Sequence, residues 1–331
     1  MLAALTKTAP PSPRELRRAG GITELVGRTP LVRIRNIARG LSPGVRILAK
    51  LEGFNPGGSV KDRAALRMIQ EAIRAGRLTA GKTLIDSTSG NTGIAVAMIG
   101  AAFGYPVRLV LPSNVSEERK GIIRFFGAET VYSDPLEGSD GAIRLCRKIV
   151  SQDPEVYFKP DQYFNPMNSQ AHYETTGPEI YRQTEGSVSH FIAGIGTGGT
   201  VMGTGRFLKE QDPRIAVIGV EPDAALHGLE GLKHMASSIV PGIYHEEELD
   251  LKMSVSTEDA YEMVYRLSRK EGLLVGQSSG AAMVAALRIA RQLTHGTVVT
   301  VFPDFGSRYL TTSLWTSWKE NLDVGNLEFS I

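Results

Sequence analysis

Short apolar runs alternate with longer amphipathic runs along most of the chain. The short runs are rich in β-branched residues and almost continuously apolar, which is typical of strands buried on both faces of a parallel sheet. They span residues 45–52, 83–88, 106–112, 129–134, 190–196, 214–222 and 297–304. The longer runs predict helices over residues 61–75, 116–126, 258–269 and 280–293. This alternation predicts an α/β fold in which helices cover mostly parallel sheets.

Length, composition and charge narrow the function classes. The chain has 331 residues, 42% of them hydrophobic, which is enough for two domains or one large α/β unit. With 37 basic and 35 acidic residues, its net charge of +2 predicts neither a nucleic-acid partner nor an anionic membrane partner. The single cysteine, Cys146, excludes an internal disulfide and a cysteine metal cluster, and no metal site is expected. We find no signal or membrane-spanning segment and expect a cytoplasmic protein whose Pro-rich residues 1–14 are disordered.

Candidate chemistry lies in glycine-rich turns, because open parallel sheets bind ligands at the carboxyl ends of their strands. The first turn, STSGNTG at residues 87–93, follows a predicted strand. Its hydroxyls and backbone N–H groups suit an anion such as a carboxylate. Ordinary helix capping by Ser or Thr explains them equally well. Asn91 follows the capping position and can hydrogen-bond a ring substituent of a bound cofactor.

Two further turns also precede predicted helices. GIGTGGT, residues 194–200, offers glycines and a helix start to a phosphate group. A dinucleotide site is the alternative, and Glu221 at the end of the next strand could serve as its acidic residue. Two threonine hydroxyls favour one terminal phosphate over a bridging pyrophosphate. The third turn, GQSSGAA at residues 276–282, suits either a helix cap or a cofactor contact.

The stretch NPGGSVKDR places Lys61 at the start of a predicted helix. A cation is electrostatically unfavourable there, since the helix dipole is positive at its N-terminus. We therefore expect a lowered pKa for the Lys61 amine and a chemical role for it rather than that of a solvated side chain.

In this order, NPGGSVKDR, TSGNTG, GTGGT and GQSSG make the chain resemble the cysteine synthase branch of the fold type II pyridoxal-phosphate enzymes. The resemblance extends from LVGRTPLVRI through DQYFNP and TTGPEIY to RYLTTSLW. It implies two lobes, each a mostly parallel twisted sheet flanked by helices. Residues 15–55 and 167–331 would form the large lobe, which binds pyridoxal 5'-phosphate. Residues 56–166 would form a small mobile lobe carrying the loop for the substrate carboxylate.

The resemblance also implies residue roles. Lys61 would form the Schiff base and then act as the general base that removes the α-proton. Asn91 would bond the ring hydroxyl and Ser278 the pyridine nitrogen. The phosphate would be held by Gly196, Thr197, Gly198, Gly199 and Thr200. The substrate carboxylate would be held by Thr88, Ser89, Thr92 and Gln162.

The reaction so implied is that of a transferase: β-replacement on an activated L-serine through an aminoacrylate, with a sulfur nucleophile giving L-cysteine. A neutral serine hydroxyl at the pyridine nitrogen favours elimination over transamination. The loop HGLEGLKHM, residues 227–235, is similar to that of M-type cysteine synthases, including members that use O-phosphoserine. Lys233 would contact that phosphate, although lysine lacks the bidentate fork of the arginine found in those members. O-Acetylserine stays open as the donor.

Several alternatives remain at this stage. A cystathionine β-synthase-type reaction or an amine nucleophile, giving a diaminopropionate-type product, would use the same motifs. More remote alternatives are an NAD-binding oxidoreductase and a non-catalytic partner that retains the cofactor. The resemblance further implies a homodimer, with the segment before residue 25 in the contact, and a sulfur-carrier protein as an additional partner. The terminal carboxylate of Ile331 would either occupy a carboxylate site or lie on the surface.

Overall fold

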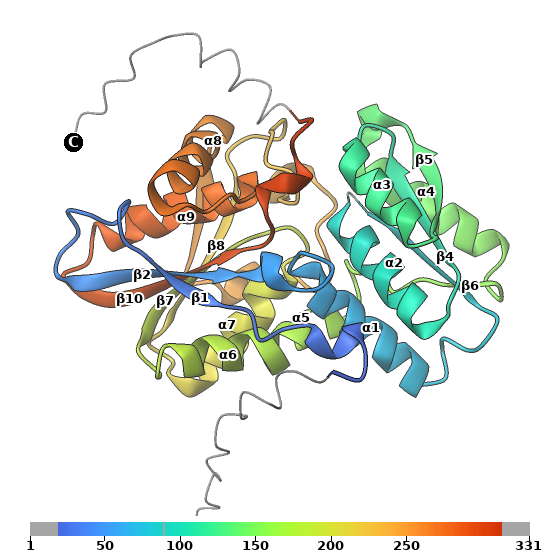
Figure 1. Ribbon diagram of the computed structural model, residues 1–331, viewed down its shortest axis with the longest axis horizontal. Coiled ribbons are helices and arrows are strands. Elements are labelled where there is room, and N and C mark those ends of the chain that lie inside the picture. The colour runs from blue at the N-terminus through green and yellow to red at the C-terminus, as the bar shows by residue number, and fades with distance from the viewer. Residues whose placement is uncertain (1–18, 89, 313–331) are drawn as a thin grey trace, which may run out of the picture.

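The computed structural model describes residues 19–88 and 90–312. The two lobes stand side by side in Figure 1, each built around its own sheet. The expected disorder of residues 1–14, the role of Ser89 and the placement of Ile331 all lie outside the described residues.

The larger sheet has six strands in the order β1-β2-β10-β7-β8-β9. All neighbours in it are parallel except β1 and β2. The strands are β1 (Leu31–Ile34), β2 (Gly44–Leu51), β7 (Val188–Gly194), β8 (Ala216–Pro222), β9 (Leu251–Val255) and β10 (His295–Phe302). β10 lies in the middle, where Val298 is opposite Ile47 of β2 on one side and His190 of β7 on the other.

Helices cover both faces of this sheet. They are α5 (Met167–Ala171), α6 (Gly177–Gln183), α7 (Gly199–Gln211), α8 (Thr257–Arg266) and α9 (Gln277–Ala290), with π-helical turns at His172–Thr176 and Leu267–Glu271. One core cluster lies between the sheet and helices α8 and α9, and another packs α6 and α7 against the opposite face. The continuous apolar runs of the strands are explained by this burial on two sides.

The smaller sheet is fully parallel, in the order β5-β4-β3-β6. Its strands are β3 (Thr83–Ser87), β4 (Val107–Pro112), β5 (Glu129–Ser133) and β6 (Tyr157–Phe158). Its helices are α1 (Lys61–Arg74), α2 (Asn91–Phe103), α3 (Glu117–Phe125) and α4 (Gly138–Gln152). Helices α1 and α2 pack on one face, whereas α4, with the buried Cys146, packs on the other.

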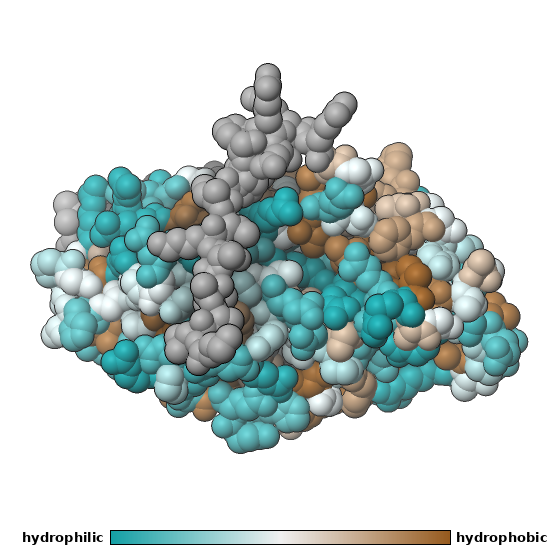
Figure 2. All heavy atoms as spheres, turned by 90° about the horizontal axis from the view of Figure 1, so that it is seen from below, coloured by the Kyte–Doolittle hydropathy of each residue, from teal (hydrophilic) through white to brown (hydrophobic). Residues whose placement is uncertain are grey.

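Six short 3₁₀ turns complete the described part of the chain. They are Ile22–Leu25, Glu52–Phe54, Pro135–Glu137, Met235–Ser237, Glu246–Glu248 and Gly306–Arg308. No helix among the described residues has both the length and the apolar character that a membrane crossing requires. The same residues contain no group of three or more His, Cys, Asp or Glu side chains placed to hold a metal ion. In the view of Figure 2, hydrophobic side chains lie in groups between hydrophilic ones, over both lobes.

The predicted α/β class is confirmed, and all seven predicted strands are present within about two residues. The sequence patterns missed β1, β6 and β9, which are all edge strands. These three strands are short and partly exposed, and therefore carry no continuous apolar run. Helix α9 begins at Gln277 rather than at the predicted residue 280, because Gly276 is the extended residue that precedes its first turn. Ser278 consequently lies within the helix and not in the turn before it.

Candidate active site

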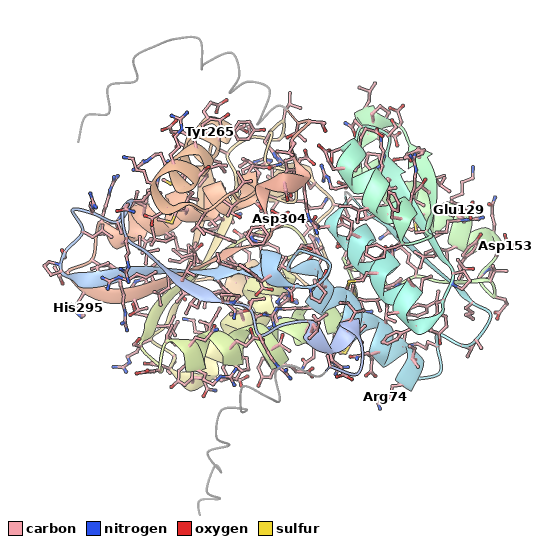
Figure 3. The ribbon with its side chains drawn as sticks, in the orientation of Figure 1. Arg74, Glu129, Asp153, Tyr265, His295 and Asp304 are labelled. Atoms are coloured by element: carbon pink, nitrogen blue, oxygen red, sulfur yellow. The ribbon has the colours of Figure 1, made fainter. Side chains whose placement is uncertain are left out.

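A cavity of about 620 Å³ lies between the two lobes, where the carboxyl ends of strands from both sheets face each other. The sequence-predicted site residues that line it are Lys61, Asn91, Thr92, Gln162, Gly196, Thr197, Gly198, Gly199, Thr200, Lys233 and Ser278. Residues far apart in the sequence are thus brought together in one place. Figure 3 shows Asp304, another lining residue, near the middle of the molecule, whereas Glu129 and Asp153 lie at the outer end of the small lobe.

Lys61 is the first residue of α1 and faces this cavity. Among the described residues, no hydrogen bond engages its amine; only its backbone N–H is bonded, to the Ser59 hydroxyl. Burial lowers the pKa of Lys61, and the nearby Asp304 carboxylate opposes this shift. The direction agrees with the expectation from the sequence, but its main cause is desolvation of the ammonium rather than the helix dipole.

The GTGGT turn forms a cradle at the start of α7. Gly198 precedes the helix with φ of 86°, a left-handed conformation that favours glycine. A Cβ at Gly196 would collide with the Gly231 carbonyl oxygen, and one at Gly199 with the Asn168 amide. Among the described residues, the Thr197 hydroxyl accepts from the N–H of Gly199 at 3.4 Å, and Gly198 itself has no side chain to cap the helix, so the N–H groups after Gly199 are available to an anion.

Asn91 is held by residues that sequence patterns did not single out. Its Nδ2 donates to Asp304, and its Oδ1 accepts from Nη1 of Arg308 at 2.6 Å. Arg308 also donates to the Gly57 carbonyl, and the Tyr309 hydroxyl donates to Asp304. These three residues follow the end of β10 in the segment PDFGSRY. Arg308 and Tyr309 belong to the RYLTTSLW similarity and Asp304 to the predicted strand 297–304, and neither signal assigned them a role.

In the STSGNTG turn, the Thr88 hydroxyl is engaged by the backbone of the turn itself. Thr88 is buried, and its hydroxyl accepts hydrogen bonds from the N–H groups of Gly90 and Gly93, both at 3.0 Å. Thr88 therefore caps the start of α2, which was the alternative considered for this turn, and it is not among the cavity-lining residues. Gly90 has φ of 139°, which lets the backbone enter the helix directly after this cap.

A hydrogen-bonded chain connects this turn to the GTGGT cradle. The Thr92 hydroxyl donates to Oε1 of Gln162 at 2.7 Å, and Gln162 in turn donates to the Ser87 carbonyl. The Asn168 amide then donates to the Gln162 carbonyl at 2.7 Å and to the Thr197 hydroxyl at 2.9 Å. Asn168 is a further site residue that the sequence patterns missed, although it lies only two residues after the quoted DQYFNP.

A second contact supports the cradle from the π-helical turn. His172 is buried, and its ring nitrogens lie 2.8 Å from the Thr176 hydroxyl and 3.3 Å from the Thr200 hydroxyl. Burial and the nearby Arg63 lower the pKa of His172 to about 3, so the imidazole is neutral near pH 7. Both threonines of the cradle are thus held by the segment that follows Gln162.

Two ion pairs cross the cavity from lobe to lobe. Lys233, in the loop after β8, lies 3.1 Å from Asp140 in the first turn of α4. Arg119 of α3 pairs with Glu230, and its guanidinium lies over the Tyr309 ring. Lys233 is therefore not the solvated loop lysine that its position in the sequence would also allow.

These residues fit pyridoxal 5'-phosphate. Three features face the same space: the Lys61 amine, which has no hydrogen-bond partner in the described part of the chain, a glycine cradle that side chains would fill, and the buried Ser278. Lys61 would hold the cofactor aldehyde, the cradle its phosphate and Ser278 its ring nitrogen. Together they define the site of an enzyme that uses this cofactor.

Comparisons with known proteins show the family to which the chain belongs. The family model "Pyridoxal-phosphate dependent enzyme" matches residues 22–304. A cysteine synthase of Aquifex aeolicus is 55% identical over 300 residues, which cover 89% of this chain and 92% of the relative. The crystal structure of a cysteine synthase from Entamoeba histolytica has a TM-score of 0.87 at 38% identity and covers 94% of both chains. An O-acetylserine dependent cystathionine beta-synthase from Helicobacter pylori has a TM-score of 0.85 at 36% identity, covering 90% of this chain and 99% of that one.

The chain belongs to the pyridoxal-phosphate dependent enzymes and, within them, to the cysteine synthase family of fold type II. Its cofactor is pyridoxal 5'-phosphate.

Proposed function

We propose that this site carries out β-replacement on an activated L-serine, with a sulfur nucleophile giving L-cysteine. The observation that carries the proposal is the arrangement around Lys61. Its amine, free of hydrogen-bond partners among the described residues, shares one cavity with the glycine cradle at the start of α7 and with Ser278. The Aquifex aeolicus relative, at 55% identity, is a cysteine synthase.

The chain's own residues divide the work as follows. Pyridoxal phosphate, when bound, withdraws electrons from the substrate Cα and so allows the β-substituent to leave. Lys61 would hold the cofactor and, once displaced by the substrate amine, accept the α-proton at its Nζ. Burial favours the neutral amine that this step requires.

The substrate carboxylate would bind at the start of α2. Thr92 and Gln162 face the cavity there, and Ser89, which is not among the described residues, remains a proposed third contact. Since Gln162 is linked through Asn168 to the phosphate cradle, substrate binding would draw the small lobe toward the large one and exclude water. Asn91, already oriented by Asp304 and Arg308, would contact the ring hydroxyl of the cofactor.

Lys233 would distinguish between the two candidate donors, O-phospho-L-serine and O-acetyl-L-serine. We propose that its ammonium, which lines the cavity, contacts the phosphate of O-phospho-L-serine, whereas O-acetyl-L-serine offers it no charge. The experiment compares the rapid-mixing rates of phosphate and acetate release from the two donors for wild type and Lys233→Ala. We expect a loss of about tenfold or more with O-phosphoserine and less than about twofold with O-acetylserine. Lys209→Ala, on the outer surface of α7, is the control. Equal losses with both donors would remove this role from Lys233.

A second candidate is the cystathionine β-synthase-type reaction, which is supported by the similarity to the O-acetylserine dependent cystathionine beta-synthase of Helicobacter pylori. The two reactions share the first half and differ in the nucleophile. Comparing kcat/KM for sulfide and for homocysteine at a fixed donor concentration separates them. A preference for homocysteine would replace the cysteine synthase assignment.

We also propose a homodimer and a sulfur-carrier protein as partners. Ile22 and Leu25 remain 43% and 48% exposed in the segment before β1, which suits a contact with a second copy. Light scattering on the purified chain tests the dimer, and Leu25→Glu is expected to weaken it. A monomer at micromolar concentration would contradict this proposal.

A further inference from the structure

Asp140 is paired with the ammonium group of Lys233, which is the cation to which the phosphate of a donor would bind. Nζ of Lys233 lies 3.1 Å from Oδ1 of Asp140, and the two side chains are 10% and 27% exposed. Lys233 belongs to the large lobe and Asp140 to the first turn of α4 in the small lobe. The pair therefore crosses the cavity, which both residues line.

Both partners are held in place by further contacts. Oδ2 of Asp140 accepts a hydrogen bond from the Ile239 N–H at 3.4 Å, so the loop after β8 engages both carboxylate oxygens. The backbone N–H of Lys233 donates to the Ile195 carbonyl at 2.9 Å, next to the phosphate cradle. Its ammonium also lies 5.3 Å from the Tyr163 ring centroid. Asp140 is thus a fixed anionic partner of Lys233 and not a mobile surface group.

The remaining charges of the cavity leave little for an incoming dianion. The described lining residues include three cations, Lys61, Arg119 and Lys233, and four carboxylates, Glu137, Asp140, Glu230 and Asp304. Arg119 is paired with Glu230, and Lys61 is assigned to the cofactor. A phosphate monoester must therefore displace Asp140 from Lys233 and remain close to that carboxylate. The neutral acetyl group of O-acetylserine pays no such electrostatic penalty.

We propose that Asp140 is a specificity-determining residue, which competes with an anionic leaving group for Lys233 and so lowers the preference for O-phosphoserine over O-acetylserine. The inference rests on the β-replacement function proposed above. A simple role as a latch between the lobes is the competing explanation. Partly exposed pairs contribute little to stability, and a latch would serve both donors equally.

The test compares kcat/KM for O-phosphoserine and O-acetylserine in the holoenzyme of wild type and Asp140→Asn. We expect the donor ratio to shift about threefold to tenfold toward O-phosphoserine, with the O-acetylserine value changing less than about twofold. The matched control is Glu137→Gln. Glu137 also lines the cavity, but it pairs with the exposed Arg144. The same loss of one negative charge should change the donor ratio by less than about twofold there.

A double-mutant cycle assigns the effect to the pair. In a Lys233→Met background, Asp140→Asn should leave the donor ratio unchanged, because the cation that both anions compete for is absent. The proposal is overturned if Asp140→Asn leaves the ratio unaltered, if it weakens both donors equally, or if its effect persists without Lys233.

Binding of inorganic phosphate gives a readout that does not require turnover. Calorimetry should show about threefold to tenfold tighter phosphate binding to Asp140→Asn than to wild type, and unchanged affinity would reject the inference. If wild type consumed neither donor, the proposed function would fail, whereas phosphate binding would still decide the role of Asp140.

Discussion

At the residue scale, Lys61 joins two properties that a surface lysine lacks. It begins a helix at the edge of a cavity, and burial shifts its pKa downward. The glycines before it allow close packing, since a Cβ at Gly58 would collide with the Arg308 guanidinium. The local chain thus places the amine, while the tertiary structure supplies the desolvation that makes it reactive.

Replacing this amine tests its role. For Lys61→Ala we expect turnover with either donor to fall by about 10³-fold or more, because both the cofactor anchor and the proton acceptor are lost. The visible absorbance of the purified protein should change as well. Lys209→Ala, which removes a surface lysine, is the control. Full turnover in Lys61→Ala would contradict the proposed mechanism.

Asp304 controls the same amine electrostatically. Its carboxylate raises the pKa of Lys61 against the effect of burial, so Asp304→Asn should lower that pKa further. More of the amine is then neutral at a given pH. In a plot of the rate of cofactor loading of the apoenzyme against pH, the acid limb, where the rate falls as the amine is protonated, should move to lower pH.

The measurement follows the rate of absorbance change on adding pyridoxal phosphate between pH 5 and 9. Tyr309→Phe removes the hydroxyl that donates to Asp304 but leaves the carboxylate charge, so its limb should move less. A limb that moves to higher pH in Asp304→Asn would show that another group controls loading.

At the scale of elements, the segment from α5 to α6 supports the phosphate cradle. Asn168 of α5 holds Thr197, and His172 of the π-helical turn holds Thr200. A Cβ at Gly203 of α7 would collide with the Ser169 carbonyl oxygen, so the two helices pack with their backbones close together. Neither contact follows from a local sequence pattern.

The neutral state of His172 makes the protein sensitive to acid. The pKa of His172 is lowered from 6.5 to about 3 in the folded state, so the unfolded chain binds the extra proton below pH 6.5. The free energy of unfolding should therefore decrease as the pH is lowered, by roughly 2 kcal/mol from pH 7 to pH 5 from this group alone.

His172→Gln should flatten this dependence, although the variant loses the contact with Thr200 and should bind the cofactor less tightly. Urea denaturation at pH 7, 6 and 5 measures the slopes, with the exposed His295→Gln as control. Asp62, whose pKa burial raises to about 7, acts in the opposite sense but is present in all these proteins and cancels. Equal slopes in wild type and His172→Gln would refute the prediction.

At the scale of the whole molecule, α1 is fixed to both lobes. Its apolar face packs in the small-lobe core, while Arg63 bonds Glu52 and Glu179 of the large lobe at 2.7 and 2.8 Å. Lys50 completes this buried group by its pair with Glu179 at 2.7 Å. The helix that carries Lys61 is thus held by two buried carboxylates, that of Glu52, which directly follows β2, and that of Glu179 in α6.

Breaking this group should destabilise the fold. Arg63→Met leaves two carboxylates buried without their main partner, and we expect the free energy of unfolding to fall by roughly 3–5 kcal/mol. Arg74→Met removes an exposed ion pair from the same helix and should leave the free energy of unfolding nearly unchanged. Guanidinium denaturation of both variants measures the difference, and similar values would contradict the buried network.

The sequence by itself determined the fold class, the interior strands and the residues around the three glycine-rich turns. These features are local, because apolar runs, helix starts and glycine turns depend on residues close together in the chain. Only the tertiary structure decided the edge strands β1, β6 and β9, the capping role of Thr88, and the contacts of Asp304, Arg308 and His172 with the site. It also decided that Lys233 faces Asp140 across the cavity, since a pair 93 residues apart depends on how two separate sheets pack against each other.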